Sequence, residues 1–271
     1  MIMYSQHPES GTEPFRADPL PVDSAGRLTL PEGFSAAELH SHTDHSDGTC
    51  TAAENVALAR GRGLAVVAIT DHDMIDAALD GMRAAAEHGL EAIVGQEITT
   101  RRQHHIVGLF LERAVPLFKT VPETVARIRD QGGLAIIAHP FLPFPGATSE
   151  STIRGWLEKT TFDGIELDSQ YLPQKRRAKL LAFYLAHADV LGAAVGGTDA
   201  HFGDVGRIAT LFPGSTAADL RAAIENRATT ATRTLISHRR PSIGERLRNQ
   251  RRSLLYLPYY RVRALLTGRY L

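Results

Sequence analysis

The chain has 271 residues, and its 30 Lys and Arg side chains balance its 30 Asp and Glu side chains, so the formal net charge at pH 7 is zero. The molecule as a whole therefore shows no preference for acidic or basic partners, and its length fits one large domain with appendages. The single cysteine, Cys50, excludes an intramolecular disulfide and a cysteine-rich zinc site. The sequence contains no run of ~18 apolar residues that could span a membrane and no signal-peptide pattern at its start. We therefore expect a cytoplasmic enzyme.

Residues 1–33 are rich in Pro, Ser, Asp and Glu and show no periodicity, which predicts a loose N-terminal arm. Beyond them, short apolar runs alternate with helical patterns. The predicted strands are 36–39, 64–69, 92–95, 104–111, 134–138, 164–167, 193–196 and 229–236. The predicted helices are 51–61, 75–88, 120–132, 151–158, 173–188 and 217–226. Two of these helices should begin with a capping box, Thr51 with Glu54 and Thr120 with Glu123.

The alternation of strand and helix, repeated about seven times, predicts an α/β fold. A closed or nearly closed (β/α) barrel over residues 34–238 is the first interpretation, and an open doubly wound sheet is the alternative. The sequence lacks a Gly-x-Gly-x-x-Gly motif and a Walker loop, so we expect no nucleotide cofactor.

Polar residues follow the predicted strands directly, where the carboxyl ends of parallel strands would bring them to one mouth of a barrel. They are His40, His42, Asp47, His72, Glu97, His105, His139, Asp199 and His201. Imidazoles and carboxylates without a thiolate suit Mn, Fe or Zn better than Mg or Ca. Because a zinc-like ion takes about four ligands, a set of this size suits two or three ions. Such ions activate water and neutralise phosphate charge, which predicts phosphate-ester hydrolysis.

Four motifs, in their order along the chain, resemble the hallmarks of the polymerase and histidinol phosphatase (PHP) superfamily. They are His40-Ser41-His42, Thr70-Asp71-His72-Asp73, Ala138-His139-Pro140 and Thr198-Asp199-Ala200-His201. Three shorter pieces also match: Ser46-Asp47-Gly48-Thr49, Gly95-Gln96-Glu97 and His105-Ile106-Val107-Gly108. The resemblance covers residues of about 36 to 236. It implies a distorted (β/α)7 barrel with a trinuclear metal cluster.

The resemblance also implies which residues share an ion. The first ion would be held by His40, His42, Glu97 and Asp199. Glu97 would bridge to a second ion on His105 and His139, and a third would take Asp47, His72 and His201. Only one of the neighbours His104 and His105 can point inward from a strand. The resemblance implies His105, because the family pattern places the ligand directly before Ile-x-Gly-like residues. Glu97, Asp199 and His201 are the predicted catalytic residues, and Asp73 is expected to orient a ligand.

The predicted substrate-binding residues are Arg207, Arg101, Arg102 and His45, since arginines at the rim could grip a phosphate through two hydrogen bonds. The expected reaction is hydrolysis of small phosphate monoesters by metal-activated hydroxide. A nuclease or cyclic-phosphate diesterase, and a metal-binding regulatory domain without turnover, are the alternatives. Family members that act on nucleoside bisphosphates carry an insertion where only 33 residues separate His105 from His139 here, which puts nucleotide specificity in question.

Residues 239–271 form a basic, aromatic tail that contains nine Arg and one acid, Glu245. Leu, Val and Tyr residues follow the arginines between 254 and 266. This composition is typical of a membrane-surface segment, a subunit contact or a nucleic-acid contact, and packing on the outside of the barrel is the alternative. No tail residue matches a ligand position, so we expect the tail to be separable from catalysis.

Overall fold

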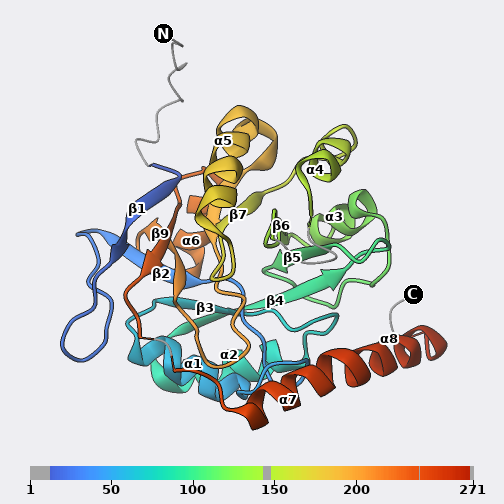
Figure 1. The fold of residues 1–271 in the computed structure, drawn as a ribbon, viewed down its shortest axis with the longest axis horizontal. Coiled ribbons are helices and arrows are strands. Elements are labelled where there is room, and N and C mark those ends of the chain that lie inside the picture. Colours follow the sequence, from blue (N-terminus) through green and yellow to red (C-terminus); the bar gives the residue numbers. More distant parts are fainter. Residues whose placement is uncertain (1–12, 143–147, 238, 269–271) are drawn as a thin grey trace.

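The computed structural model of the protein describes residues 13–142, 148–237 and 239–268 (Figure 1). Its strands run around a central axis, with helices packed on their outer side, and α7, η1 and α8 form a long rod along one flank. In this part of the chain, no helix is long and apolar enough to cross a membrane.

The strands join into one sheet in the order β1-β10-β9-β2-β3-β4-β5-β6-β7-β8. Their bounds are β1 Phe15–Leu20, β2 Phe34–Glu38, β3 Val66–Ile69, β4 Glu91–Thr99, β5 His105–Leu109, β6 Leu134–Ile137, β7 Gly164–Asp168, β8 Ala193–Gly196, β9 Ile208–Pro213 and β10 Thr230–Thr234. Strands β2, β3 and β4 are mutually parallel, as are β6, β7 and β8, whereas β5 and β9 run antiparallel to their neighbours. These two reversed strands distort the barrel.

Side-chain hydrogen bonds bring the last strand, β8, back to the start of the barrel. Thr210 of β9 donates through Oγ1 to the carbonyl oxygen of Gly196 at 2.9 Å, and Thr229 donates to that of Ala194 at 2.6 Å. The sheet therefore closes nearly completely, and the predicted α/β class with a distorted barrel is confirmed.

The predicted helices are all present, as α1 Ala52–Gly61, α2 Asp76–His88, α3 Val121–Arg129, α4 Glu150–Leu157, α5 Gln174–Leu191 and α6 Ala217–Glu225. Both predicted capping boxes form, at Thr51 and at Thr120. Three further segments continue beyond the barrel: α7 Ile243–Arg251, the π-helical η1 Arg252–Tyr256 and α8 Leu257–Leu266.

The expectation of a loose arm over residues 1–33 is wrong for Phe15–Leu20. This segment is β1, which pairs in parallel with β10 and buries Leu20. Its charged residues and its proline hide the strand in the sequence, because an edge strand is stabilised by main-chain pairing and can carry both on its open side. Residues 1–12 lie outside the described chain.

Both faces of the parallel strands are buried, which explains their continuous apolar runs. In β3, Val67 and Ile69 pack in one apolar cluster, while Val66 and Ala68 pack in another. Polar side chains are therefore confined mainly to the strand ends and the segments that follow them. The predicted metal ligands occupy these positions.

Candidate metal centre

Main-chain pairing at the barrel mouth brings the ligand-bearing segments together. The amide of His42 donates to the carbonyl of Ala200 at 2.9 Å, and the amide of Asp199 donates to that of His40 at 3.0 Å. An isolated parallel bridge likewise joins His72 to Glu97. Motifs more than 100 residues apart in the sequence thus become neighbouring strand ends, which is why the nine predicted ligands converge.

One group of four residues matches the set that the resemblance implies for the first ion. One ligand atom from each of His40, His42, Glu97 and Asp199 lies within 4.8 Å of the others. The Nε2 atoms of His40 and His42 are both 3.3 Å from Glu97 Oε2, and that of His42 is 3.1 Å from Asp199 Oδ1. This spacing allows all four to face one cation.

Two other groups share residues with the first. Asp47, His72 and His201 form a group that also includes His42, with His201 Nε2 3.2 Å from Asp47 Oδ1. Glu97 and His105 form a group with His72, with His105 Nδ1 2.8 Å from Glu97 Oε1.

His139 was expected beside Glu97 and His105. Its Nε2 is 2.8 Å from Glu97 Oε1. The group in which ligand atoms lie within 4.8 Å of one another, however, contains His72 beside Glu97 and His105, and not His139. His104 turns away from the centre and packs edge-on against the ring of Trp156, with 5.4 Å between the ring centroids. His105 is thus the member of this pair that faces Glu97.

The donor atoms fit divalent metal ions. Within the described residues, His40 Nε2, His42 Nδ1 and His72 Nδ1 are buried and make no hydrogen bond. A buried polar atom without a partner costs about 1–3 kcal/mol, and several in one place indicate a ligand that satisfies them. Three imidazole nitrogens beside the carboxylates of Asp47, Glu97 and Asp199 form a donor set that Mn, Fe or Zn would take.

Burial and neighbouring charges shift the pKa values of the side chains in the centre in opposite directions. Burial would raise the pKa of Asp47, but His201 and His72 hold that pKa well below its usual range. Burial would lower the pKa of His201, but Asp47 and Asp199 raise it to about 10. Burial dominates at His72 and lowers its pKa to about 4, against the attraction of Glu97 and Asp47. His72 is therefore a neutral donor at neutral pH.

Comparisons with known proteins agree with this geometry. Residues 38–231 match the family model of the PHP domain. The chain belongs to the PHP domain family. It is 32% identical over 146 residues to an uncharacterized protein of Methanocaldococcus jannaschii, a match that covers 50% of this chain and 82% of the relative.

Two curated relatives of this PHP protein have named activities. A 5'-3' exoribonuclease of Haemophilus influenzae is 34% identical over 102 residues, which is 36% of this chain and 37% of the relative. A 3',5'-nucleoside bisphosphate phosphatase of Chromobacterium violaceum is 37% identical over 82 residues, which is 29% of each chain. The chain therefore aligns with 37% of the first relative and only 29% of the second.

A solved structure shares the fold. It is a two-domain protein of Bacteroides vulgatus that contains a predicted PHP-like metal-dependent phosphoesterase, with a TM-score of 0.64 and 19% identity. The match covers 83% of this chain and 70% of that one. The PHP-type barrel predicted from the sequence motifs is thus confirmed.

Two buried glutamates support the ligands and were not identified from the sequence. Glu166 accepts from His40 Nδ1 at 2.7 Å and from the amide of His139 at 2.6 Å. The first contact places the proton on Nδ1 and leaves Nε2 of His40 free to bind a cation. Glu38 accepts from the amides of His40 and Thr198 at 3.0 and 2.9 Å, and burial raises its pKa to about 7.

Two aspartates of the second motif hold the loops. Asp71 accepts from the amide of Thr43 at 2.8 Å and from the hydroxyl of Ser46, and so fixes the turn that leads to Asp47. Asp73 has a φ of 59° and accepts from the amide of Thr99 at 2.7 Å, which ties the residue after His72 to the strand that carries Glu97. This contact fixes backbone rather than a ligand side chain, so the expectation that Asp73 orients a ligand stays a prediction.

The four predicted substrate-binding residues lie in three places. Arg207 donates to Gln170 Oε1 at 2.8 Å, and Gln170 contacts the carbonyl of Asp199, so Arg207 lies near the first ligand group. His45 is exposed and lines an open cavity of about 620 Å³ with residues of α7 and η1.

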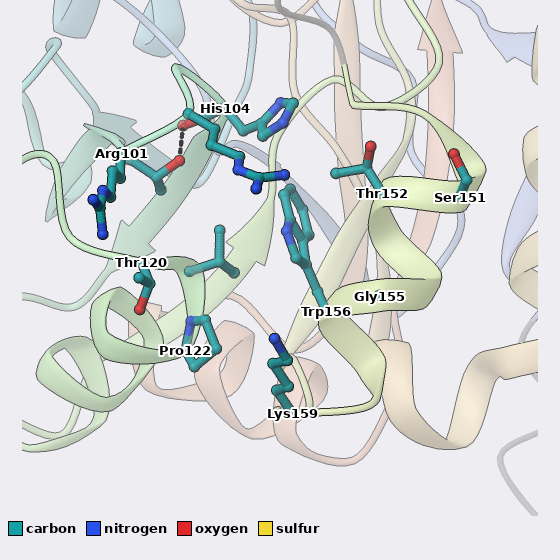
Figure 2. Close-up of a pocket in the computed structure, with 12 residues that line it drawn as sticks. Arg101, His104, Thr120, Pro122, Ser151, Thr152, Gly155, Trp156 and Lys159 are labelled. Carbon is teal, nitrogen blue, oxygen red and sulfur yellow. Dashed lines mark hydrogen bonds between the residues drawn. The ribbon is translucent and has the colours of Figure 1, made fainter.

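Arg101 and Arg102 lie on the turn between β4 and β5, on the rim of a cavity of about 810 Å³ (Figure 2). Trp156 and Lys159 line its other side, on and after α4. The cavity carries three basic side chains and no carboxylate, so it suits an anionic group.

The tail contacts the loops that carry the ligands. Asn249 Nδ2 donates to the carbonyl of Asp47 at 2.7 Å, and Arg252 Nη1 donates to that of Ser46 at 3.2 Å. Arg261 Nε donates to Asp73 Oδ2 at 2.7 Å. The expectation of a tail separable from catalysis therefore loses its structural basis. The partner residues lie on loops of the barrel, so the sequence of the tail alone could not indicate these contacts.

Proposed function

We propose that this PHP protein hydrolyses small phosphate monoesters at a centre of two or three divalent transition-metal ions, Mn, Fe or Zn. The chain is a hydrolase that acts on phosphate ester bonds. The observation that carries the proposal is the convergence of nine imidazole and carboxylate side chains at one end of the barrel, with three of the imidazole nitrogens buried and without a hydrogen bond within the described chain. The single cysteine makes the cytoplasm the proposed location.

Glu97 is the central residue of the proposed centre. Its Oε2 lies 3.3 Å from the Nε2 atoms of His40 and His42 and 3.1 Å from His72 Nδ1. Its Oε1 lies 2.8 Å from ring nitrogens of His105 and His139. One carboxylate in contact with five imidazoles can join two ligand groups, and we assign Glu97 the bridging role on that basis.

The remaining ligands complete the groups around Glu97. Asp199 would join His40 and His42, and His201 would join Asp47 and His72. His201 Nδ1 donates to the carbonyl of Asp199 at 3.0 Å, which leaves Nε2 facing Asp47. Ions bound here would lower the pKa of water and neutralise the charge of a phosphate group.

The substrate would be held by side chains outside the ligand groups. Arg207 is linked to Asp199 through Gln170, which holds this predicted binding arginine beside the proposed reaction centre. The cavity beside Arg101 and Arg102 would hold the part of the substrate that carries further negative charge (Figure 2). Basic side chains in both places would pair with the oxygens of a small anionic ester.

A nuclease is the second candidate, because one curated relative is named as a 5'-3' exoribonuclease. The basic cavity with Trp156 on its wall would suit a nucleotide, since bases stack on aromatic rings and phosphates pair with Arg and Lys. We keep the monoesterase first, because a centre of two or three cations suits the additional negative charge of a phosphate monoester.

Metal analysis and a substrate panel test the proposal. Purified protein should carry two or three Mn, Fe or Zn ions per chain, and dialysis against a chelator should abolish phosphate release, which added Mn should restore. Small monoesters, cyclic diesters and a 5'-phosphorylated RNA should be compared on the same preparation. Cleavage of RNA alone would favour the nuclease. At most one ion per chain after reconstitution, or full turnover without metal, would contradict the proposed centre.

A further inference from the structure

The exposed hydrophobic side chains of this protein are concentrated on the tail. In the described residues, fourteen large hydrophobic side chains are exposed, and nine of them lie between residues 243 and 266. They are Ile243, Leu247, Leu254, Leu255, Tyr256, Tyr259, Val262, Leu265 and Leu266. Leu254 is 72% exposed and Leu266 is 83% exposed. An apolar surface of this extent in a stable protein usually marks an interaction site.

This surface is not the face by which the tail packs on the barrel. Leu257 and Ala264 are buried, and Tyr260 packs with Leu117 in a small apolar cluster. Arg261 reaches inward to Asp73. Leu255, Tyr256 and Tyr259 border the open cavity beside His45. The other six exposed residues line neither this cavity nor the inward face, and we call the surface they form the outer tail face.

Positive charge accompanies the outer tail face. Arg246, Arg248, Arg251 and Arg263 are exposed and form no ion pair with any described residue. The only acid of the tail, Glu245, is already paired with Arg239. The tail therefore offers apolar contact area and uncompensated positive charge together.

The charge and the side-chain types of this face indicate which kind of partner binds it: a second copy of the chain, a nucleic acid or a lipid surface. A second copy of the chain would bring two strongly basic helices together, which is electrostatically unfavourable. Nucleic acid would match the arginines, but seven of the nine exposed side chains are aliphatic and offer no ring on which a base could stack. An anionic lipid surface satisfies both features, since headgroups pair with Arg and the acyl boundary accepts Leu, Ile and Val.

We propose that the outer tail face binds an anionic membrane surface, with α7, η1 and α8 lying in the interface plane. This binding goes beyond the hydrolase activity and does not depend on it. Because Asn249 and Arg252 also hold the loop that leads to Asp47, the bound protein would keep its catalytic mouth close to the lipid boundary.

Vesicle sedimentation with the full-length, metal-loaded protein tests the proposal. The probes are vesicles of phosphatidylcholine alone and of phosphatidylcholine mixed with phosphatidylglycerol. The protein should sediment with the mixed vesicles, remain in solution with phosphatidylcholine alone, and bind the mixed vesicles less tightly at high salt.

Two variants test whether vesicle binding depends on the outer tail face or on exposed leucines anywhere on the protein. The double variant Leu254→Asp, Leu266→Asp should weaken vesicle binding by about tenfold or more, since two apolar contacts are replaced by anions. Leu235→Asp is the control, because Leu235 is 57% exposed but lies outside the tail, directly after β10. Circular dichroism and metal content should be the same in all three proteins.

Three outcomes would overturn the proposal. The first is no binding to anionic vesicles, or binding that the double variant leaves unchanged. The second is a dimer in analytical ultracentrifugation that the double variant dissolves, which would assign the face to a second copy. The third is binding to a single-stranded RNA that the double variant abolishes, with no vesicle binding. Loss of phosphate release with vesicle binding intact would count only against the proposed enzyme activity.

Discussion

Proteins usually bury apolar side chains and give buried polar atoms a hydrogen-bond partner, and the barrel mouth and the tail depart from this in opposite ways. At the mouth, polar imidazole nitrogens are buried without a hydrogen-bond partner in the described chain. On the tail, Leu254, Leu255 and Leu266 are exposed. Each arrangement costs free energy in the isolated protein, through desolvation at the mouth and through hydration of apolar surface on the tail. Both regions therefore indicate a partner outside the polypeptide, which we propose to be metal ions for one and a lipid surface for the other.

The two regions are joined by a few hydrogen bonds from the inward face of the tail. Arg261 pairs with Asp73 and also donates to Thr99 Oγ1 at 2.8 Å. Asn249 holds the carbonyl of Asp47. The tail thus has two different faces: one completes the frame of the metal centre, and the other is free for contact. Variants on the two faces should give different defects.

The largest effect is expected for Glu97→Gln at the mouth. Loss of the charge removes an anionic ligand from two neighbouring groups and leaves the repulsion between bound cations less offset. Loss of a residue that merely supports a metal ligand already costs 10- to 100-fold, so activity should fall by more than ~100-fold. Elemental analysis and phosphate release should be measured on the same samples, where the metal content should fall as well.

His45→Ala is the matched control for this change. His45 lies on the ligand-bearing loop but outside the three ligand groups, so this variant should retain its metal and lose only a few-fold in turnover. A Glu97→Gln protein with full metal content and near-normal activity would contradict the bridging role of Glu97.

An intermediate effect is expected for Arg261→Ala on the inward face of the tail. Arg261 is mostly buried and Asp73 is fully buried, so removal of the arginine leaves a buried carboxylate unpaired, which typically costs about 3–5 kcal/mol. The loops of His72 and Glu97 should loosen, and metal affinity should fall by about 10- to 100-fold. Isothermal titration with Mn or Zn measures this affinity independently of turnover.

Arg263→Ala provides the control on the outer side of α8. Arg263 is exposed and pairs with no carboxylate of the described chain, so its loss should leave metal affinity unchanged and weaken only vesicle binding. Arg261→Lys should restore part of the metal affinity by keeping the charge. If both alanine variants lowered metal affinity equally, the division of the tail into two faces would be wrong.

Most of the metal ligands could be predicted from the sequence because they lie at or just after the end of a short apolar run. His105 instead begins β5, which runs antiparallel to its neighbours and so starts at the mouth. The local pattern of a buried strand followed by His, Asp or Glu places the side chain at the barrel mouth whatever the rest of the chain does. Glu38 and Glu166 carried a weaker local sign: Glu38 ends the mainly apolar strand β2, and Glu166 lies in β7 two residues before Asp168. An acid in a buried strand could have marked both as partners of the ligands.

The contacts of the tail could not be predicted in the same way. Arg261 lies 188 residues from Asp73, and no periodicity links them. The strand β1 was missed for a similar reason, because its partner β10 is more than 200 residues away and supplies the pairing through main-chain atoms. Composition revealed the basic and apolar character of the tail, but only the packed barrel determines which of its faces is covered.

The smallest effect concerns acidification, which should affect the mouth before the tail. Hydrogen bonds from Arg239 and Ser242 lower the pKa of Glu245 from 4.5 to about 2, and this carboxylate forms the capping box of α7. A pKa that is lowered in the folded state stabilises the protein above the ordinary value of 4.5, and this contribution is lost as the pH falls from there through about 2. At the mouth, protons compete with metal ions for the imidazoles at higher pH, since the pKa of His201 is raised to about 10. Metal should therefore dissociate while α7 is still capped.

Hydrogen exchange of the α7 amides, corrected for its intrinsic pH dependence, should rise a few-fold only below pH 4.5. Glu245→Gln should remove this dependence, because the amide side chain does not titrate. An equal response in the variant and the parent would show that α7 loosens with the barrel rather than through its own cap.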